Sequence, residues 1–308
     1  MADLENLNNK ENLNEAPLNT TFPETNERLE KDPELEEARK IIEEWWDTKN
    51  IKKLNPELVE LLAMQYAKKG IRLKQDGQYD NAFLSLDGLK SINKETAEAL
   101  SYYEWDNLEL SWMTQISTWV AEALWRAKCL NLTLDGLVDI SPEVAKNLSQ
   151  YWGIRLNLNG LKKISQAVAT ELSAFKWKPD QIIKRNNTIV MERYKGVLVL
   201  EWVESIDATV ANELSKTLAD LRLWLTSLDK ETAKALAKYK WQEIRLRKLK
   251  NIDKDTAKEL APIIKKLQVS PEIEAMIVPF VGLKSEEKQE NKLEEPKKKK
   301  KKKSGTIY

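Results

Sequence analysis

Apolar residues recur along the chain in a pattern that switches between two periods. The stretch LTLDGLVDISPEVAKNLSQYWG from Leu132 is followed by the similar stretch LNLNGLKKISQAVATELSAFKW from Leu156. An isoleucine or leucine, here called the anchor, marks the same point of each copy, with an alanine five residues and a leucine eight residues after it. A fixed period of this length indicates stacked supersecondary units. The anchors are Ile92, Ile116, Ile140, Ile164, Ile206, Leu228 and Ile252, and the intervals between them are 24, 24, 24, 42, 22 and 24.

Each unit divides into a strand segment and a helix segment. Before the anchor, segments such as LTL, LNL, LVL and IRL place apolar residues two apart, which is the period of a strand with one buried face. After the anchor, apolar residues stand four, five and eight positions on and draw one stripe along a helix. Asp-Gly or Asn-Gly pairs such as Asp135-Gly136 supply turn residues between the two segments. The residues directly after the anchors are good N-caps: Asn93, Ser117, Ser141, Ser165, Asp207, Asp229 and Asp253.

A strand and a helix as short as these can bury their apolar faces only against neighbouring units. The pattern therefore predicts an α/β repeat solenoid of about seven units, with parallel strands backed by helices. One repeat is also long enough to hold two short helices, so an all-helical array is the alternative.

These units resemble the leucine-rich repeat family. The shared motif is an L-x-L strand followed by a spaced leucine and a helix, as in LTLDGLVDI, and it covers about Leu84 to Leu267. The resemblance implies a binding scaffold. The chain departs from the family where the usual pattern places a ladder of asparagine or cysteine, which leaves the curvature of the solenoid open. The residues at that position are Leu89, Met113, Leu137, Leu161, Val203, Leu225 and Leu249.

Charge and polarity divide the chain into five segments. Residues 1–37 hold eleven Asp and Glu against three Lys and Arg, which predicts a disordered acidic segment. Residues 38–82 are predicted to form a helical N-terminal cap, in which Leu54 acts as an anchor. Residues 83–267 form the leucine-rich-repeat-like solenoid, with an insert at 178–195, and residues 268–283 the C-terminal cap. Residues 284–308, with ten Lys against five Glu, are predicted to be a disordered Lys-rich tail.

A second pattern competes for the residues before Phe83. Gly70, Gly77, Tyr79 and Ala82 match the first helix of a tetratricopeptide repeat. The second helix of such a repeat would have to be FLSLDGLKS, which alternates like a strand. A cap followed by a loop is therefore favoured.

The composition excludes several kinds of chemistry. The chain has no histidine, so it lacks catalytic triads and imidazole metal sites. Its one cysteine, Cys129, excludes an internal disulfide and stands where other units have Trp105, Trp177 or Trp241, which predicts a buried apolar role. No phosphate-binding glycine loop or metal cluster appears, so no cofactor is expected. The chain shows no signal peptide and no membrane-spanning run, so a cytoplasmic location is expected.

Residues that alternate with the strand leucines are expected to face outward on an open sheet surface. Their charge changes from acidic to basic along the chain, which could match a polar partner or be a solvated face. The residues selected as candidate contacts from this set are Glu109, Thr133, Arg155, Asn157, Val199, Arg222 and Arg245.

Two further features are candidate contact sites. Trp112, Trp202 and Trp224 stand four residues before their anchors, where other units have glycine, and could either form an aromatic strip or pack over the adjoining turns. The 178–195 insert carries five basic residues, including Lys184 and Arg185, against two acidic ones. Asn186-Asn187 within it predicts a short hairpin. The insert could belong to the binding face or be a degenerate repeat that continues the stack.

The function expected from these features is non-catalytic recognition of a protein or peptide through the strand surface and the insert. One alternative is nonspecific binding of nucleic acid or another acidic surface by Lys297–Lys303. No aromatic residue interrupts these lysines, so they offer no stacking platform for bases. The other alternative is an enzyme that works without histidine.

Overall fold

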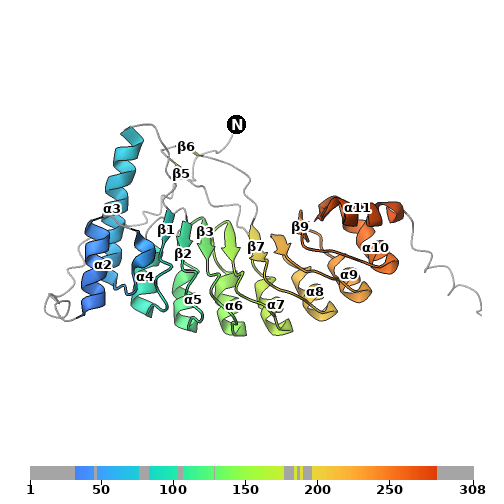
Figure 1. Cartoon of the computed structure of the whole chain (residues 1–308), viewed down its shortest axis with the longest axis horizontal. Helices are drawn as coiled ribbons and strands as arrows, with labels where there is room; N and C mark the ends of the chain where they lie inside the picture. Colours follow the sequence, from blue (N-terminus) through green and yellow to red (C-terminus); the bar gives the residue numbers. More distant parts are fainter. Residues whose placement is uncertain are drawn as a thin grey trace, which may run out of the picture.

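The computed structural model shows alternating strands and helices stacked along one axis (Figure 1). It describes residues 32–44, 47–75, 83–102, 107–127, 129–176, 184–185, 188–189 and 196–282, of which 66–75, 184–185 and 188–189 are described by their backbone alone. Eight strands form one open sheet in the order β1-β2-β3-β4-β7-β8-β9-β10, and all neighbours are parallel. This arrangement confirms the α/β solenoid and rules out the all-helical array.

The elements follow the predicted order of strand and helix in every unit. The strands of the main sheet are β1 (Phe83–Ser85), β2 (Asn107–Glu109), β3 (Asn131–Thr133), β4 (Arg155–Asn157), β7 (Val197–Leu200), β8 (Asp220–Leu223), β9 (Ile244–Arg245) and β10 (Leu267–Gln268). The helices are α2 (Pro33–Glu43), α3 (Pro56–Gln75), α4 (Lys94–Tyr102), α5 (Thr118–Leu124), α6 (Pro142–Ser149), α7 (Gln166–Leu172), α8 (Ala208–Leu214), α9 (Lys230–Leu236), α10 (Lys254–Leu260) and α11 (Pro271–Ile277). Short 3-10 helices lie at Thr48–Asn50, Ala261–Lys266 and Val278–Phe280.

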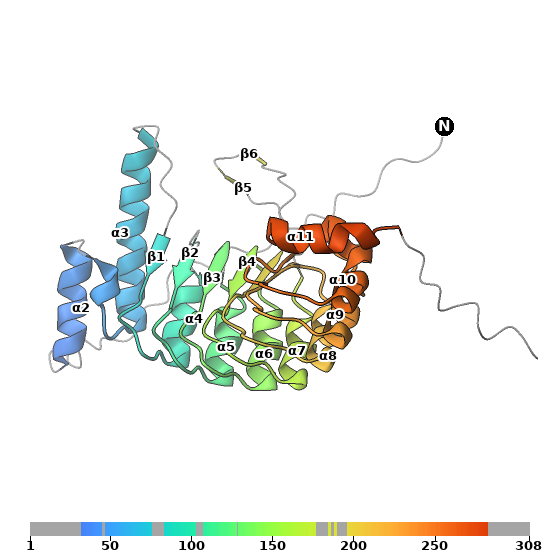
Figure 2. The ribbon, with the colours of Figure 1, turned by 45° about the vertical axis from the view of Figure 1, so that its right-hand side comes forward.

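The core lies between the sheet and the row of helices. In the unit of β3 and α6, Leu132 and Leu134 enter from the strand, and Ala145 and Leu148 enter from the helix. All four are fully buried, as the two periods of the sequence predict. Consecutive helices from α4 to α10 line one face of the sheet (Figure 2).

All seven predicted N-cap residues act as caps. Ser141 Oγ accepts a hydrogen bond from the backbone N–H of Val144 at 3.2 Å, and Asp253 Oδ1 accepts one from Thr256 at 2.7 Å. Each bond satisfies a free N–H of the first turn and begins the helix at the same point of its unit. The corresponding bonds are made by Asn93, Ser117, Ser165, Asp207 and Asp229.

The residues at the position of the asparagine or cysteine ladder, from Leu89 to Leu249, are apolar and belong to the core. Six of the strands, β1 to β4, β7 and β9, end in a turn closed by a backbone hydrogen bond, such as that from Leu137 N–H to the carbonyl of Leu134 at 3.2 Å. The residue that follows each turn is buried, from Leu89 at the first strand to Leu249 at the ninth. Apolar contact therefore takes the place of a polar ladder in every unit.

Helical segments cap both ends of the array. At the N-terminal end, Asn55 Oδ1 caps α3, and Leu58, Val59 and Leu62 are buried at the spacings expected from Leu54 as an anchor. At the C-terminal end, Ser270 caps α11, whose Ile273 and Ile277 are buried. Helix α3 continues to Gln75 and a strand begins at Phe83, which agrees with a cap and not with a tetratricopeptide hairpin.

One predicted boundary differs from the structure. Residues 33–37, which the charge pattern assigns to the disordered acidic segment, belong to helix α2. Asp32 caps the helix by accepting a hydrogen bond from Glu34 N–H, and Pro33 occupies the first turn. Acidic side chains in this turn are stabilised by the positive end of the helix dipole. The rest of the predicted acidic segment, the tail at 284–308 and Lys297–Lys303 lie outside the described residues.

The insert leaves the main sheet rather than adding a rung to it. Strand β4 pairs directly with β7, although the insert separates them in the sequence. Within the insert, β5 (Lys184–Arg185) and β6 (Thr188–Ile189) pair as antiparallel strands in a separate sheet. The predicted hairpin pairing is therefore confirmed, although Asn186-Asn187 themselves lie outside the described residues, and the interpretation as a degenerate repeat within the stack is wrong.

Candidate partner-binding face

The strand face is the side of the main sheet that carries the side chains alternating with the core leucines. Because parallel strands lie about 4.8 Å apart, residues in register form continuous rows across it. The central row consists of Ser85, Glu109, Thr133, Asn157, Val199, Arg222, Arg245 and Gln268. Two residues earlier, Arg155 is in register with Val197, which is in register with Asp220. The structure thus brings together the strand residues selected from the sequence.

The part of the strand face formed by β1 to β4 is acidic and amide-rich. Side-chain hydrogen bonds cross the strands, from Asn131 to Asn107 at 2.6 Å and from Asn157 to Thr133 at 2.9 Å. Glu109 lies among Asp87 and Asp135, and burial together with these like charges raises the pKa of its carboxyl. This end of the strand face would suit a neutral or basic group of a ligand.

A row of side-chain acceptors at the strand ends was not predicted. Asp135 Oδ1 accepts a hydrogen bond from Asn159 N–H of the next unit at 3.0 Å, and Asn159 Oδ1 accepts one from Glu201 N–H at 3.0 Å. Asp87 does the same for Ser111 N–H at 3.1 Å. The sequence signal was the Asp or Asn before glycine, which predicts a turn but not a contact with the next unit.

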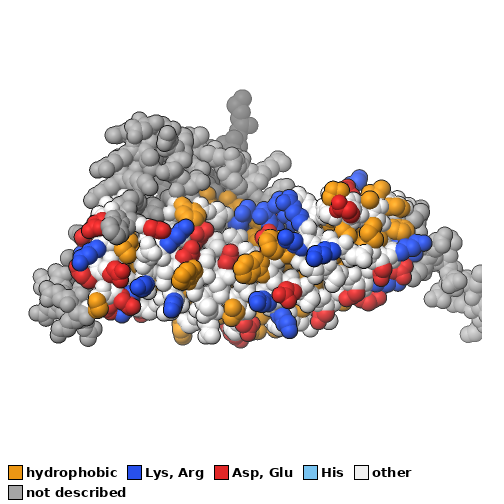
Figure 3. All heavy atoms as spheres, in the orientation of Figure 1, with side chains coloured by type: hydrophobic (Ala, Val, Ile, Leu, Met, Phe, Trp, Pro, Cys, Tyr) orange, Lys and Arg blue, Asp and Glu red, His pale blue; other side chains and the backbone are white. Residues whose placement is uncertain are grey.

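The part of the strand face formed by β4 to β9 is basic. Arg155 and Arg222 are partly buried, and the Nε atoms of both are buried with no hydrogen-bond acceptor among the described residues. Burial and the nearby charges of Arg155 and Arg245 lower the pKa of the Arg222 guanidinium, although Glu201 and Glu243 oppose this shift. Figure 3 shows Lys and Arg side chains gathered along the upper edge of the array, between the positions of β7 and β9.

Arg245 differs from the other two arginines because it has a carboxylate partner. Its Nε donates to Glu243 Oε1, while Glu243 Oε2 accepts a hydrogen bond from Gln268 at 2.6 Å. Arg247 donates to Gln268 Oε1 at 2.9 Å. The side chains of β9 and β10 are therefore held in a satisfied network.

Two of the selected residues point to the strand face but offer little surface. Val199 is 3% exposed and Thr133 is 8% exposed. Val199 stands in register between Asn157 and Arg222, and Thr133 accepts the hydrogen bond from Asn157. Cross-strand neighbours in a sheet are close enough for the longer side chains to cover such short ones. These two residues form the floor of the strand face rather than contacts for a partner.

Two of the three selected tryptophans are exposed just beyond the ends of their strands, β2 and β7. Trp112 is 60% exposed and Trp202 is 53% exposed, so packing over the adjoining turns does not bury them. Between them, Gly136 and Gly160 occupy the same position in the units of β3 and β4. The two tryptophans are thus three strands apart, roughly 14 Å, with glycines between them.

Trp224 does not belong to the same row as the other two tryptophans. Leu223 lies five residues before its anchor, whereas Leu200, its partner in register, lies six before its own. Trp224 therefore shares a row with Glu201, one position before Trp202. It is partly buried, and Lys248 Nζ lies 5.0 Å from the centroid of its ring. An aromatic strip of three residues is not formed.

Lys184 and Arg185 make up strand β5 of the insert hairpin. Their backbone pairing is described, while their side chains lie outside the described residues. The insert joins the main sheet at Gly196, directly before β7. It therefore joins the sheet at the start of the strands, where Arg155 is the first residue of β4 and Val197 the first residue of β7.

Cys129 is buried as predicted. Its thiol lies 3.1 Å from the hydroxyl of Tyr151, and burial raises the pKa of the thiol to about 12. A thiol in this state is a poor nucleophile at neutral pH. The described residues contain no group of His, Cys, Asp and Glu that could hold a metal ion, and no helix among them is long and apolar enough to cross a membrane.

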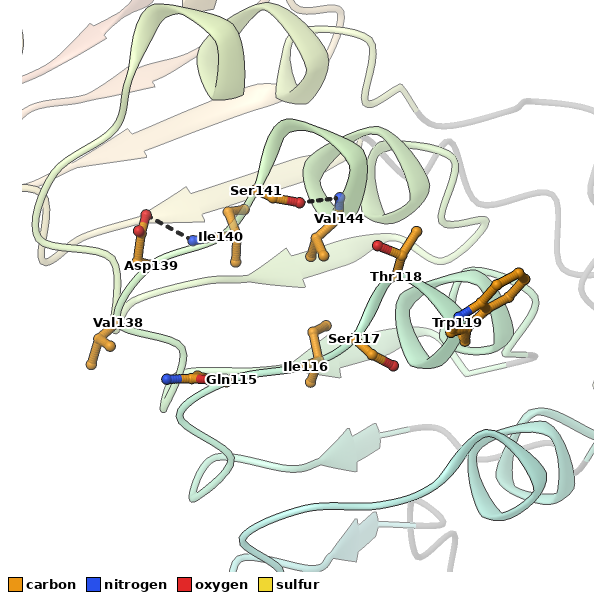
Figure 4. Close-up of a pocket in the computed structure, with 10 residues that line it drawn as sticks. All are labelled: Gln115, Ile116, Ser117, Thr118, Trp119, Val138, Asp139, Ile140, Ser141 and Val144. Atoms are coloured by element: carbon orange, nitrogen blue, oxygen red, sulfur yellow. Dashed lines mark hydrogen bonds between the residues drawn. The ribbon is translucent and has the colours of Figure 1, made fainter.

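A hollow of about 470 Å³ lies away from the strand rows, between the loops that lead into α5 and α6 (Figure 4). Trp119 and Val138 stand exposed beside it. Several of its polar groups have local partners: Ser117 Oγ caps α5, Ser141 Oγ caps α6, and Asp139 Oδ1 accepts a hydrogen bond from Ile140 N–H at 2.9 Å. The hollow therefore presents few free polar groups to a ligand.

No known protein-family model matches the chain, and no curated protein matches it.

Proposed function

We propose that the chain is a non-catalytic scaffold of the leucine-rich-repeat type that binds a protein or peptide through the strand face and the 178–195 insert. The observation that carries this proposal is the strand face itself, a sheet of eight parallel strands whose rows are mostly polar, with Trp112 and Trp202 exposed just beyond the ends of β2 and β7. Tryptophan is enriched among the residues that anchor protein interfaces. A broad face suits a polypeptide better than a small substrate, which is usually held in an enclosed pocket.

Two observations favour binding over catalysis. Cys129, the only thiol, is buried with a pKa of about 12, and the chain has no histidine. Burial and the charges of Asp87 and Asp135 raise the pKa of Glu109, and the neighbouring Ser85 hydroxyl bonds to these carboxylates on an open face. An active site would need such groups to converge on one substrate position.

The experiment compares two matched variants of the full chain in co-precipitation from native lysate. Each captured protein is then purified, and its affinity for the wild type and for both variants is measured. Trp112→Ser with Trp202→Ser removes the exposed aromatic groups at the ends of β2 and β7. Trp119→Ser removes an equally exposed tryptophan from helix α5, on the other side of the sheet. The proposal expects the first variant to lose partners that wild type and Trp119→Ser retain.

Retention of every partner by the Trp112→Ser/Trp202→Ser variant would place the binding surface elsewhere. A chain lacking residues 178–195 tests the insert separately. If that deletion keeps every partner, the insert is not part of the binding site and the strand face alone remains. Comparison of the variants by circular dichroism checks that each one is folded.

A further inference from the structure

We infer that the strand face between β4 and β9 recognises an acidic segment of a partner polypeptide, with Arg155 and Arg222 binding its carboxylates. This inference rests on the proposed function and names the chemistry that the basic half of the strand face would accept. It requires that these two arginines, and not the lysine tail, supply the binding site.

The first reason is that the two guanidinium groups lack partners within the described structure. No carboxylate in that part of the chain lies within salt-bridge distance of Arg155 or Arg222, in contrast to Arg245 and Glu243. Their buried Nε–H groups donate to no acceptor there. A buried donor without an acceptor is costly, and so is a positive charge held close to another. A carboxylate bound at the other guanidinium nitrogens would offset the repulsion between the two charges.

The second reason is the position of the two side chains. Arg155 is on β4 and Arg222 on β8, with only β7 between these strands in the sheet, so the strands are roughly 10 Å apart. The residues of β7 between them are the buried Val197 and Val199. These two valines are almost fully covered, so the surface between β4 and β8 is made by longer side chains such as those of Arg155 and Arg222.

The third reason is the pairing of the neighbouring groups. Arg245 and Gln268 are held by Glu243, and Asp220 accepts the backbone N–H of Glu243 at 3.1 Å. Glu201 is the nearby carboxylate that makes no ion pair with a described residue, and its charge acts on Arg222. Arg155 and Arg222 are therefore the two arginines of this region without an ion pair to a described residue. Arginine binds carboxylates through two parallel hydrogen bonds, which gives both strength and geometry.

Charge along the strand face favours a polypeptide over a nucleic acid. Glu109, Asp87 and Asp135 lie at the other end of the same face and would repel a continuous phosphate backbone. A polypeptide can place carboxylates over β4 to β8 and neutral or basic residues over β1 to β3. A polypeptide with a short acidic segment, flanked by neutral or basic residues, thus fits both halves of the strand face.

The test measures binding of a fluorescein-labelled twelve-residue peptide of alternating glutamate and serine by fluorescence polarisation. The proteins are the full chain, Arg155→Gln, Arg222→Gln and the matched control Arg126→Gln, whose arginine is exposed near the end of α5. Each is also prepared with Lys297–Lys303 replaced by glutamine, which removes binding by the tail. A peptide with glutamine in place of glutamate controls for charge.

We expect Arg155→Gln and Arg222→Gln each to weaken binding of the acidic peptide about tenfold, as befits a charged hydrogen bond. Arg126→Gln should bind the acidic peptide as tightly as wild type does. The glutamine peptide should bind all of the proteins with the same affinity. Urea unfolding of the free proteins should find neither arginine variant less stable than wild type, because neither loses a partner. A lower urea midpoint with unchanged peptide affinity would show that the arginines are structural and would overturn the inference.

Two further outcomes also oppose the inference. Loss of all binding on tail substitution alone would assign the acidic peptide to the lysines. Tighter binding of random duplex DNA than of the peptide, with the same dependence on Arg155 and Arg222, would assign the site to phosphate. The proposed function is tested separately from this inference, because it fails only if the Trp112→Ser/Trp202→Ser variant retains every partner.

Discussion

The hydroxyl of Tyr151 donates a hydrogen bond to the backbone carbonyl of Cys129 at 2.7 Å. Tyr151 follows helix α6, whereas Cys129 lies between helix α5 of the preceding unit and β3, so the bond joins the end of one unit to the end of the unit before it. Tyr239, at the same distance from its anchor, donates to the carbonyls of Ala219 at 2.8 Å and Glu243 at 2.9 Å. Both tyrosines are buried, and burial raises the pKa of each hydroxyl. A buried phenol thus satisfies the backbone where the chain turns from helix to strand.

Tyr151→Phe should destabilise the protein by about 1–3 kcal/mol, because it leaves the buried carbonyl of Cys129 without this donor. Urea unfolding followed by circular dichroism measures the change. Tyr102→Phe, at a tyrosine that is 73% exposed, is the matched control and should have no effect. Equal midpoints for the two variants would contradict the role assigned to Tyr151.

Gly153→Ala should also be destabilising, because the added Cβ would lie 2.1 Å from the hydroxyl of Tyr151 and 2.6 Å from the carbonyl of Cys129. Overpacking of this kind typically costs about 1–3 kcal/mol. Part of the clash is with the group that Tyr151→Phe removes. The double variant should therefore be more stable than the sum of the single effects allows. Additive effects in urea unfolding would show that the two sites are independent.

Cys129 should react with a thiol reagent only after the protein unfolds. Its thiol is buried and has a pKa of about 12, so the thiolate is scarce at pH 8 and hidden from solvent. The absorbance change with a disulfide reagent measures the rate, and one thiol per chain makes the signal unambiguous. Labelling of the native protein as fast as in urea would refute this prediction.

The Asp253 cap should lose its stabilising effect in acid. Hydrogen bonds from the backbone and side chain of Thr256 lower the pKa of Asp253 below its ordinary value of 3.8. A depressed folded-state pKa contributes stability above the unfolded pKa, and this contribution is lost as the pH falls through the folded pKa. Asp253→Asn keeps a capping oxygen but does not titrate in this range.

The pH series is measured as urea midpoints of wild type and Asp253→Asn from pH 7 down to pH 3. The difference between the two proteins should be constant above about pH 5 and should shift against wild type below about pH 4. Ser141→Ala, at a cap without charge, should lower stability by about 1 kcal/mol at every pH. A constant difference between wild type and Asp253→Asn over the whole range would exclude a contribution from ionisation.

If the protein binds duplex DNA, Lys297–Lys303 should supply most of the affinity. Seven phosphate contacts would give a log–log dependence on salt concentration with a slope of up to about −6, without sequence preference. Titration of random duplex DNA against wild type and the glutamine-substituted tail at several salt concentrations measures this. Unchanged affinity after substitution would exclude the tail, and a sequence preference would point to the repeat surface.

The sequence was sufficient to predict the repeated unit. The leucines of each strand alternate, the helix stripe follows its anchor, and each cap residue lies next to the helix that it begins. These relations act over a few residues and recur in seven units, so each unit supports the assignment of the others. The apolar row from Leu89 to Leu249 and the hairpin at Asn186-Asn187 followed from the same local patterns.

What the tertiary structure alone decided concerns relations between units. Strand β4 pairs directly with β7, so the insert adds no strand to the main sheet. The connection from β8 to its anchor is one residue shorter than that from β7, so Trp224 is not in the row of Trp202. The same pairing brought Arg155 close to Arg222 and covered Val199 between its neighbours. Periodicity fixes which face a side chain occupies. Only the order and register of the strands fix which residues of that face meet, because residues far apart in sequence become neighbours through backbone hydrogen bonds between strands.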